Sequence, residues 1–423
     1  MRRIWWCLGL VAGLLASPLR ADSTSEANPA LQRLTEQARE QALLLDHDQG
    51  RFSGPAYERL LAEGRQARFF LIGEEHGIAE NPLLAAALFG ELVEAGYRRL
   101  TIEISAPMAA TLDRTLRQGG LSALADLYAE PGGEPAFFGM QQEAELLASV
   151  RAAVDDELVL WGIDYEVGGD RQLLRELAAL PRPDQAEASL SALLQASRQS
   201  WARFEAERDP QYIFSFSGDP ELARAVRTDW PDAPPAATAI LQTLEDTFAI
   251  NRLWVSGQGW RSNELRGERM RQNFLQHWRQ AEVSGAPPRV MVKLGASHLV
   301  RGRNMTDTFD LGALLPELAA IRGERSFSLL VLPGIDSQVA RLDPVAWAYQ
   351  PAPAKDGYDD ALEPLLAAAV DGRFTLIDLR PLRPLLPASR SSEALRRVVM
   401  GFDMLLVLNG STPSSEFAAP AAE

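Results

Sequence analysis

Ionisable side chains gather where apolar runs of this sequence end. The stretch FFLIGEEHG places Glu74, Glu75 and His76 directly after four apolar residues and a glycine. The stretch VKLGASHL carries Lys293 inside an apolar run and His298 just after it. Carboxylates beside an imidazole are groups that proteins use for general acid–base catalysis or for holding a divalent metal ion.

Two further apolar runs carry carboxylates in the same way. Glu103 interrupts the run LTIEIS between two isoleucines, and Asp164 and Glu166 follow the run LVLWGI. Each residue taken alone has an ordinary alternative, such as a solvated sheet edge, a helix cap or a core histidine. However, a charged side chain inside a buried strand costs several kcal/mol unless it is paired, and Glu103 and Lys293 both face this cost. We therefore predict that these groups meet in one shared polar site.

The elements that must position these groups are typical of an α/β protein. The apolar runs are continuous rather than alternating, as in strands that are covered on both faces of a parallel sheet. Helical stretches at 81–97 and 140–156 separate them. We predict an α/β fold with a mainly parallel central sheet flanked by helices, in which ligands bind beyond the carboxyl ends of the strands. The predicted strands are residues 68–73, 98–105, 157–166, 289–299, 325–334, 373–379 and 404–410.

The middle of the chain, about residues 168–288, shows no comparable strand and is rich in aromatic residues. We predict a helical insertion that caps the strand ends, with most of its aromatic side chains forming the core of a helical layer. His277 lies in its last helix, outside the pattern of ionisable groups at the strand ends, and we expect it to be structural.

That last helix carries a possible binding face. Arg266, Met270 and Asn273 are spaced i, i+4, i+7 and so share one face, with Arg269 one turn before Asn273. An arginine and an amide on one face could hold an anionic or carbonyl-bearing substrate. The alternative is an exposed helix face that carries many charges.

The two ends of the chain predict processing and disorder. Residues 1–21 combine an Arg-Arg start, an apolar segment too short for a comfortable membrane span and a cleavage site after Ala21, which is the pattern of a secretory signal peptide. We expect residues 22–411 to form a single domain that begins with a helix within 22–50. Residues 412–423 are expected to be a disordered tail.

Export would change the composition of the mature protein. Loss of residues 1–21 removes three arginines and the only cysteine, Cys7, and leaves 39 basic against 57 acidic residues, a net charge of −18. Such a chain has no thiol nucleophile, disulfide or thiolate metal site. Its acidic surface repels nucleic acid and anionic membranes. We expect a bacterial periplasmic or secreted protein without a stable membrane anchor, whose partner is a small-molecule or peptide substrate. The sequence does not indicate an oligomeric state.

The order of these motifs resembles the erythromycin esterase-like superfamily, which is related to the ChaN-like haem-binding proteins and the TraB/Tiki-type proteins. The resemblance covers about residues 65–413. One residue separates the glutamate and histidine of the first motif, a spacing closer to the ChaN and TraB pattern. The matching residues are Gly73, Glu74, His76, Glu103, Arg266, Met270, Asn273, Gly295, Ala296 and His298.

The resemblance implies hydrolysis of an ester, lactone or amide. The sequence has no Gly-x-Ser-x-Gly elbow, so activated water is the natural nucleophile. His76 would be the general base, oriented by Glu74 or Glu103, and His298 and Arg266 would stabilise negative charge on the substrate oxygen. The remaining site candidates, expected in substrate binding, are Glu75, Asp164, Glu166, Asn273 and Lys293.

Two cofactor alternatives stay open. His76, Glu103 and His298 could hold a divalent metal ion such as Mn, Co or Zn that activates the water. Alternatively, the protein could be a haem- or ligand-binding protein of the ChaN-like type without catalysis, with His76 as an axial ligand of the iron. An inactive scaffold is a third possibility.

Overall fold

A computed structural model describes residues 29–285, 287–386 and 392–418. The predicted signal peptide, residues 1–21, lies outside these ranges. Within them, no helix has both the length and the apolar character needed to cross a membrane.

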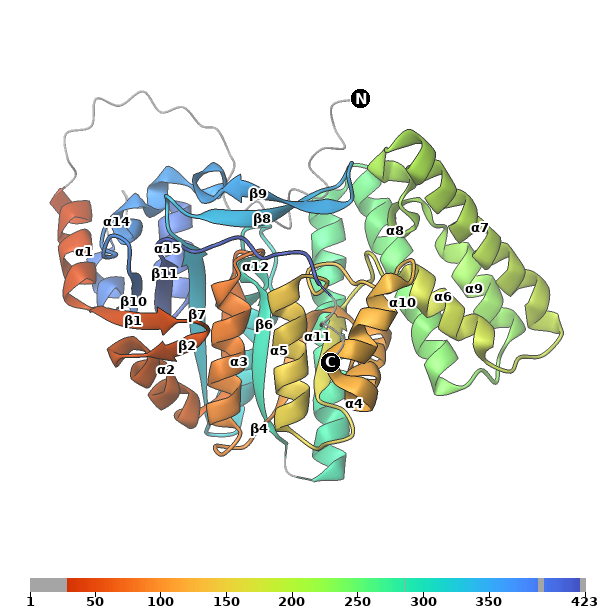
Figure 1. Ribbon diagram of the computed structural model, residues 1–423, viewed down its shortest axis with the longest axis horizontal. Helices are drawn as coiled ribbons and strands as arrows, with labels where there is room; N and C mark the ends of the chain where they lie inside the picture. The colour runs from red at the N-terminus through yellow and green to blue at the C-terminus, as the bar shows by residue number, and fades with distance from the viewer. Residues whose placement is uncertain (1–28, 286, 387–391, 419–423) are drawn as a thin grey trace.

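A nine-stranded sheet forms the centre of the molecule, with strand order β2-β1-β10-β11-β7-β3-β6-β4-β5 (Figure 1). The strands from β11 to β5 run parallel, whereas β2, β1 and β10 add an antiparallel edge. The predicted mainly parallel sheet is confirmed. The strands are β1 (Ala42–Asp48), β2 (Arg51–Ser53), β3 (Ala67–Glu74), β4 (Tyr97–Ser105), β5 (Leu160–Asp164), β6 (Arg289–Gly295), β7 (Arg325–Pro333), β10 (Phe374–Asp378) and β11 (Met404–Leu408).

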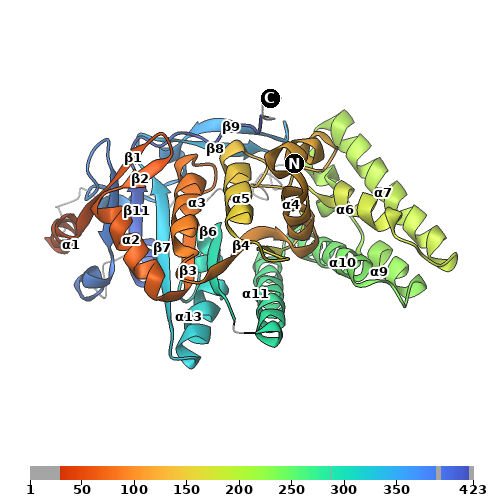
Figure 2. The same cartoon turned by 60° about the horizontal axis from the view of Figure 1, so that its bottom comes forward.

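Helices cover both faces of this sheet, which explains the continuous apolar runs (Figure 2). In β3, Phe70 and Ile72 join one core, while Phe69 and Leu71 join the core on the opposite face. The first face is covered by α2 (Pro55–Gln66), α3 (Glu80–Leu92), α4 (Ala106–Ala129) and α5 (Gln141–Ala153). The other is covered by α1 (Pro29–Glu40), α11 (Gly259–Ser284), α12 (Ala296–Leu299), α13 (Leu311–Ile321), α14 (Glu363–Leu366) and α15 (Glu393–Gly401).

The helical insertion forms a lobe beyond the β5 edge of the sheet (Figure 1). Its aromatic side chains are mostly core, as predicted: Trp201, Phe204, Phe214 and Phe248 are all buried. The lobe consists of α6 (Asp170–Ala179), α7 (Gln185–Glu207), α8 (Phe214–Ser217), α9 (Pro220–Asp229) and α10 (Pro235–Val255), and it continues into α11.

An antiparallel hairpin, β8 (Gln338–Asp343) and β9 (Ala348–Pro353), crosses the carboxyl end of the sheet (Figure 1). We call residues 338–353 the strap. The backbone N–H of Ala340 donates to the carbonyl of Gly77, 2.9 Å away, and Trp347 packs edge-on against Trp201 of the lobe. The strap was not predicted, because its strands are mixed in polarity and largely half-buried.

Two segments differ from expectation. The predicted leading helix ends at Glu40, and residues 42–48 form β1 instead, because the segment LLL pairs with β10 at the open edge of the sheet. The predicted disordered tail is ordered as far as residue 418. Ala79 donates to the carbonyl of Thr412 at 3.0 Å and Ser414 donates to Gly77 at 2.9 Å, so backbone pairing outweighs the composition of this segment.

Candidate active site

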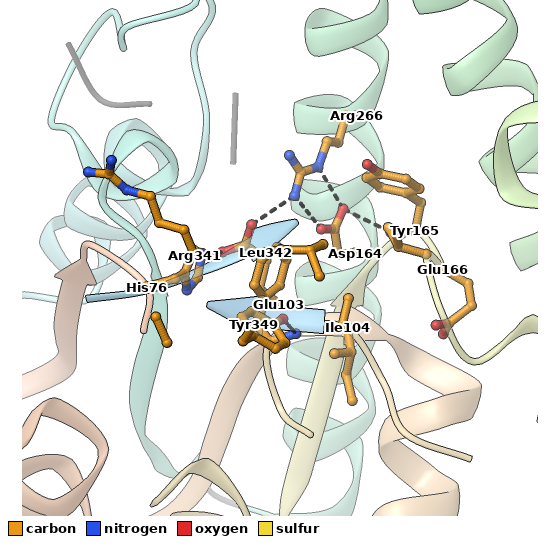
Figure 3. A pocket seen from close by; sticks show the side chains of 14 residues that line it. His76, Glu103, Ile104, Asp164, Tyr165, Glu166, Arg266, Arg341, Leu342 and Tyr349 are labelled. Carbon is orange, nitrogen blue, oxygen red and sulfur yellow. Dashed lines mark hydrogen bonds and ion pairs between the residues drawn. The ribbon is translucent and has the colours of Figure 1, made fainter. Parts of the chain in front are cut away.

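The carboxyl ends of the parallel strands bring the predicted ionisable groups together (Figure 3). Glu74 ends β3 and His76 follows it, Glu103 lies near the end of β4, and Asp164 ends β5. His298 follows β6 in the short helix α12. Arg266 reaches the same place from α11. The shared polar site is therefore built from separate elements, as parallel-sheet topology predicts.

Glu103 lies at the centre of this site. Its Oε2 is 3.5 Å from Nε2 of His76, and its Oε1 is 3.4 Å from Nε2 of His298. The backbone N–H of Gly295 donates to Oε2 at 2.6 Å. A Cβ at Gly295 would lie 3.0 Å from the His76 ring nitrogen and 3.2 Å from Oε2 of Glu103. The missing side chain at Gly295 thus lets the two groups approach above β6.

Arg266 closes one side of the site. Its Nη2 donates to Oε1 of Glu103 at 2.8 Å, and its Nε donates to Oδ1 of Asp164 at 3.0 Å. A further bond from Nη2 to Oδ2 of Asp164 makes this pair bidentate. Asp164 therefore neutralises and aims the guanidinium. The guanidinium carbon lies 4.9 Å from the centre of the Tyr165 ring.

His76 is held rigidly. Its Nδ1 lies 2.9 Å from Oε1 of Glu74, and its ring stacks on Phe137 with centroids 4.3 Å apart. Its buried Nε2 makes no hydrogen bond to any described residue, since 3.5 Å to Glu103 is too long. The ring is thus held by a hydrogen bond at Nδ1, whereas Nε2 keeps its hydrogen-bonding capacity unused.

The carboxylates set the charge of both histidines. Burial alone would lower the pKa of His76, but the charge of the flanking carboxylates Glu103 and Glu74, with the hydrogen bond from Glu74, outweighs burial and raises it to about 10. Burial likewise opposes the charged form of His298, while Glu103 and Asp310 raise its pKa to about 9. Burial would raise the pKa of Glu103, but the two histidines hold it well below its usual value. At neutral pH both rings are cationic and Glu103 is anionic.

Lys293 lies beneath the site and supports it. The side chain is fully buried, and its Nζ lies 2.7 Å from Oε1 of Glu74 and 2.6 Å from Oε1 of Glu143. Asn81 donates its amide to the other oxygen of Glu74. Lys293 therefore positions Glu74, whereas we had predicted that it binds substrate. Burial raises the pKa of Glu143 to about 7, although the ammonium of Lys293 opposes this.

Other predicted binding residues are already engaged. Asn273 does not line the His76 pocket; it donates to the carbonyl of Ile163 at 2.8 Å and supports the end of β5. Glu166 lines that pocket, but its carboxylate accepts from Ser105 at 2.5 Å and from the backbone of Gly169 at 2.8 Å, so it braces the loop after β5.

Glu75 also lies outside the pocket wall. It is buried, which raises its pKa to about 7 despite the nearby charge of Arg341. Arg269 pairs with Asp246 at 3.1 Å. His277 stacks on Trp161 and bonds the carbonyl of Gly162, consistent with its expected structural role.

Several pocket residues had no distinguishing signal in the sequence. Phe137 comes from the loop before α5, and the strap contributes Arg341, Leu342 and Tyr349 to the wall (Figure 3). The three strap residues were missed because the strap itself was not predicted. Asp310, 2.6 Å from Nδ1 of His298, also caps α13, and such a cap is the one signal that could have drawn attention to it.

The donor set does not fit a metal ion. Among the described residues, no group of three or more His, Cys, Asp or Glu side chains is arranged to hold one. Glu103 turns a different carboxylate oxygen toward each histidine, and the guanidinium of Arg266 places a positive charge against one of these two oxygens. A haem iron fits poorly too, because Glu74 and Glu103 face the two ring nitrogens of His76 and Phe137 covers its face.

No family model matches the sequence, and no curated protein matches it. Solved structures do match the fold. A Bacillus cereus protein has a TM-score of 0.55 at 14% identity, covering 92% of this chain and 99% of its own. A succinoglycan biosynthesis protein has a TM-score of 0.54 at 12% identity, covering 92% of this chain and all of its own. A mutant of the erythromycin esterase EreC in its open conformation has a TM-score of 0.55 at 17% identity, covering 86% of this chain and 95% of its own. The chain shares the fold of these proteins, as the motif resemblance predicted.

Proposed function

We propose that this protein is a hydrolase that cleaves an ester, lactone or amide with water activated by His76. The observation that carries the proposal is the state of the His76 ring: Glu74 holds Nδ1, while Nε2 is buried beside the pocket without a hydrogen bond to any described residue. When the ring is neutral, this is the arrangement of a general base whose second nitrogen can accept a proton. The shared fold with an erythromycin esterase supports a hydrolase.

The reaction uses the groups in sequence. With Nδ1–H donated to Glu74, the lone pair on Nε2 of His76 takes a proton from water as the water oxygen adds to the substrate carbonyl carbon. The carbon–oxygen or carbon–nitrogen bond then breaks. The proton on Nε2 passes to the leaving oxygen or nitrogen, which yields a carboxylic acid and an alcohol or amine.

His298 and Arg266 stabilise the intermediate in this mechanism. Both are cationic and lie against Glu103. Asp310 and Asp164 hold them in place from behind. Donors fixed in advance near a developing oxyanion lower the barrier without reorganising during the reaction.

The raised pKa of His76 has a direct consequence for activity. An imidazolium cannot accept a proton, so only the fraction of molecules with neutral His76 is active. Because the pKa of His76 is about 10, catalysis increases as pH rises above neutrality.

Turnover assays test the proposal. The purified protein is assayed on simple esters, lactones and short peptides, in chelator and with added Mn, Co or Zn. We expect turnover of at least one class in chelator, without stimulation by metal. Turnover that requires metal would contradict the mechanism. If wild-type protein hydrolyses none of these substrates, the proposed function is wrong, and a Soret shift on haem titration would then support the binding alternative.

We further propose that the protein is exported and matures by cleavage after Ala21. The support is the pattern of residues 1–21. Mass spectrometry of the protein from a bacterial periplasmic extract should give the mass of residues 22–423, whereas an uncleaved cytosolic protein would contradict export.

A further inference from the structure

A second pocket lies on the other side of Arg266. Arg266 and Tyr165 line both pockets and form the wall between them. His76 lines only the first pocket, and His298 lines only the second. Since Glu103 contacts both histidines, the chemistry described above takes place at the boundary between two separate binding spaces.

The two pockets differ in character. Away from the ionisable groups, the first is walled mostly by apolar side chains, including Ile104, Phe137, Val167 and Leu342. The second is lined by hydroxyl and amide groups from α10, α11, α12 and the segment 304–308, with Trp254 and Phe216 as its aromatic surfaces. A substrate that extends into both spaces would have one apolar and one polar arm.

Most polar groups of the second pocket are already used within the protein. Asn251 donates to the carbonyl of Ser215 at 2.7 Å, and Ser262 donates to the carbonyl of Ile250 at 2.8 Å. Asn304 accepts from the hydroxyls of Thr306 and Thr308. These bonds hold the pocket in shape and leave little capacity for a ligand.

Two half-buried residues are different. Asn263 and Ser297 line the second pocket, and neither side chain hydrogen-bonds to another residue in the part of the chain that the structure describes. Asn263 lies one helical turn before Arg266, and Ser297 directly precedes His298. Both unused groups therefore stand next to residues that handle the reacting carbonyl.

The charges in this pocket are already balanced. Asp164 and Glu103 pair with Arg266, and Asp310 pairs with His298. Among the described residues that line this pocket, a charged ligand would find no unpaired group of opposite charge. A neutral group that both donates and accepts hydrogen bonds matches an amide and a hydroxyl.

We propose that Asn263 and Ser297 bind a neutral hydroxyl- or amide-bearing arm of the substrate, while the apolar arm lies in the pocket under the strap. The substrate class is then an amphipathic ester, lactone or amide whose scissile carbonyl lies at Arg266. This inference rests on the proposed function, because it assigns the two arms around that reaction.

The test compares two esters that share one apolar acyl group: a hexanoate ester of glycerol and a hexanoate ester of butanol. We expect wild-type protein to favour the glycerol ester by about tenfold in kcat/KM, the effect of two modest hydrogen bonds. Asn263→Leu and Ser297→Ala should each reduce this preference, by lowering kcat/KM for the glycerol ester more than for the butyl ester. Gln272→Leu, an exposed position on the same helix, and Ser256→Ala should keep it.

Equal turnover of both esters by wild-type protein, or variants that keep the wild-type preference, would overturn this inference while leaving the hydrolase intact. Calorimetric binding of both esters to His76→Asn protein reads the preference without turnover. If neither ester is hydrolysed, a binding preference that Asn263→Leu abolishes supports the assigned arm and contradicts only the proposed reaction. If neither ester is hydrolysed and no binding preference is found, both are overturned.

Discussion

Glu103 and His76 approach within 3.5 Å of each other although another strand, β6, lies between their strands in the sheet. The approach is possible because β6 ends in Gly295 directly beneath them, where a Cβ would crowd both groups. This steric requirement therefore explains why the Gly-Ala-x-His motif begins with a glycine.

Gly295→Ala should impair catalysis more than folding. The backbone at Gly295 suits any residue, with φ of −51°, but the new methyl group would press on the His76 ring and the Glu103 carboxylate. We expect kcat/KM to fall roughly tenfold to a hundredfold, since small misplacements of catalytic groups are costly. Gly90→Ala, in open space on α3, is the matched control. Ester turnover and urea unfolding measure the two effects. An active Gly295→Ala protein would show that the spacing above β6 is unimportant.

The pH dependence of kcat/KM should peak between about 9 and about 10. Neutral His76 is required, and its pKa is about 10, while cationic His298 is required, and its pKa is about 9. Glu103→Gln removes a negative charge that raises both pKa values, so the optimum should move to lower pH.

Asp310→Asn is the companion variant for the pH dependence. It removes a charge beside His298 alone, and asparagine can still cap α13. The pKa of His298 should fall, so activity should be lost at a lower pH on the alkaline side. A pH optimum unchanged in both variants would contradict the assigned roles.

Lys293→Met should destabilise the fold strongly. Removing the ammonium leaves Glu74 and Glu143 buried without their cation, at a cost of about 3–5 kcal/mol. A buried carboxyl group whose pKa is raised in the folded protein destabilises the fold as the pH rises above the pKa that the group has in the unfolded state. Lys293→Met should therefore lose less stability near pH 5 than near pH 8.

Denaturant unfolding of Lys293→Met at the two pH values gives this comparison. Lys355→Met, at the only other lysine and exposed, is the control and should unfold like the wild type. The double variant Lys293→Met with Glu143→Leu should recover part of the lost stability. A single variant as stable as wild type would mean that the buried ion pairs do not hold Glu74.

Gly77→Ala should detach the strap from the loop that carries His76. Gly77 has φ of +86°, and a Cβ there would lie 2.0 Å from the carbonyl oxygen of Ala340. Gly96 has a similar φ of +97° with nothing within 4 Å, so Gly96→Ala shows the cost of backbone strain alone, about 1–2 kcal/mol. We expect Gly77→Ala to lose more stability than this and most of its ester turnover. Equal losses in the two variants would mean that contact with the strap contributes nothing.

The sequence predicted the groups at the strand ends better than the groups that surround them. Glu103 and Lys293 stood out because charge inside an apolar strand needs a partner. Glu143 and the strap residue Tyr349 did not, since a glutamate in a helix and a tyrosine in a mixed-polarity strand are common on protein surfaces. Lys293 was correctly placed near the site, but its burial under Glu74 depends on side-chain direction, which strand periodicity alone did not resolve.

The most direct test of the central claim compares ester hydrolysis by wild-type protein and by His76→Asn in chelator, with background hydrolysis subtracted. His47→Asn, in β1 at the opposite edge of the sheet, is the control. If His76 is the general base, kcat of His76→Asn should fall by roughly 10²–10⁴-fold while the protein stays folded, and His47→Asn should retain activity. Turnover by a folded His76→Asn protein at the wild-type rate would contradict the mechanism.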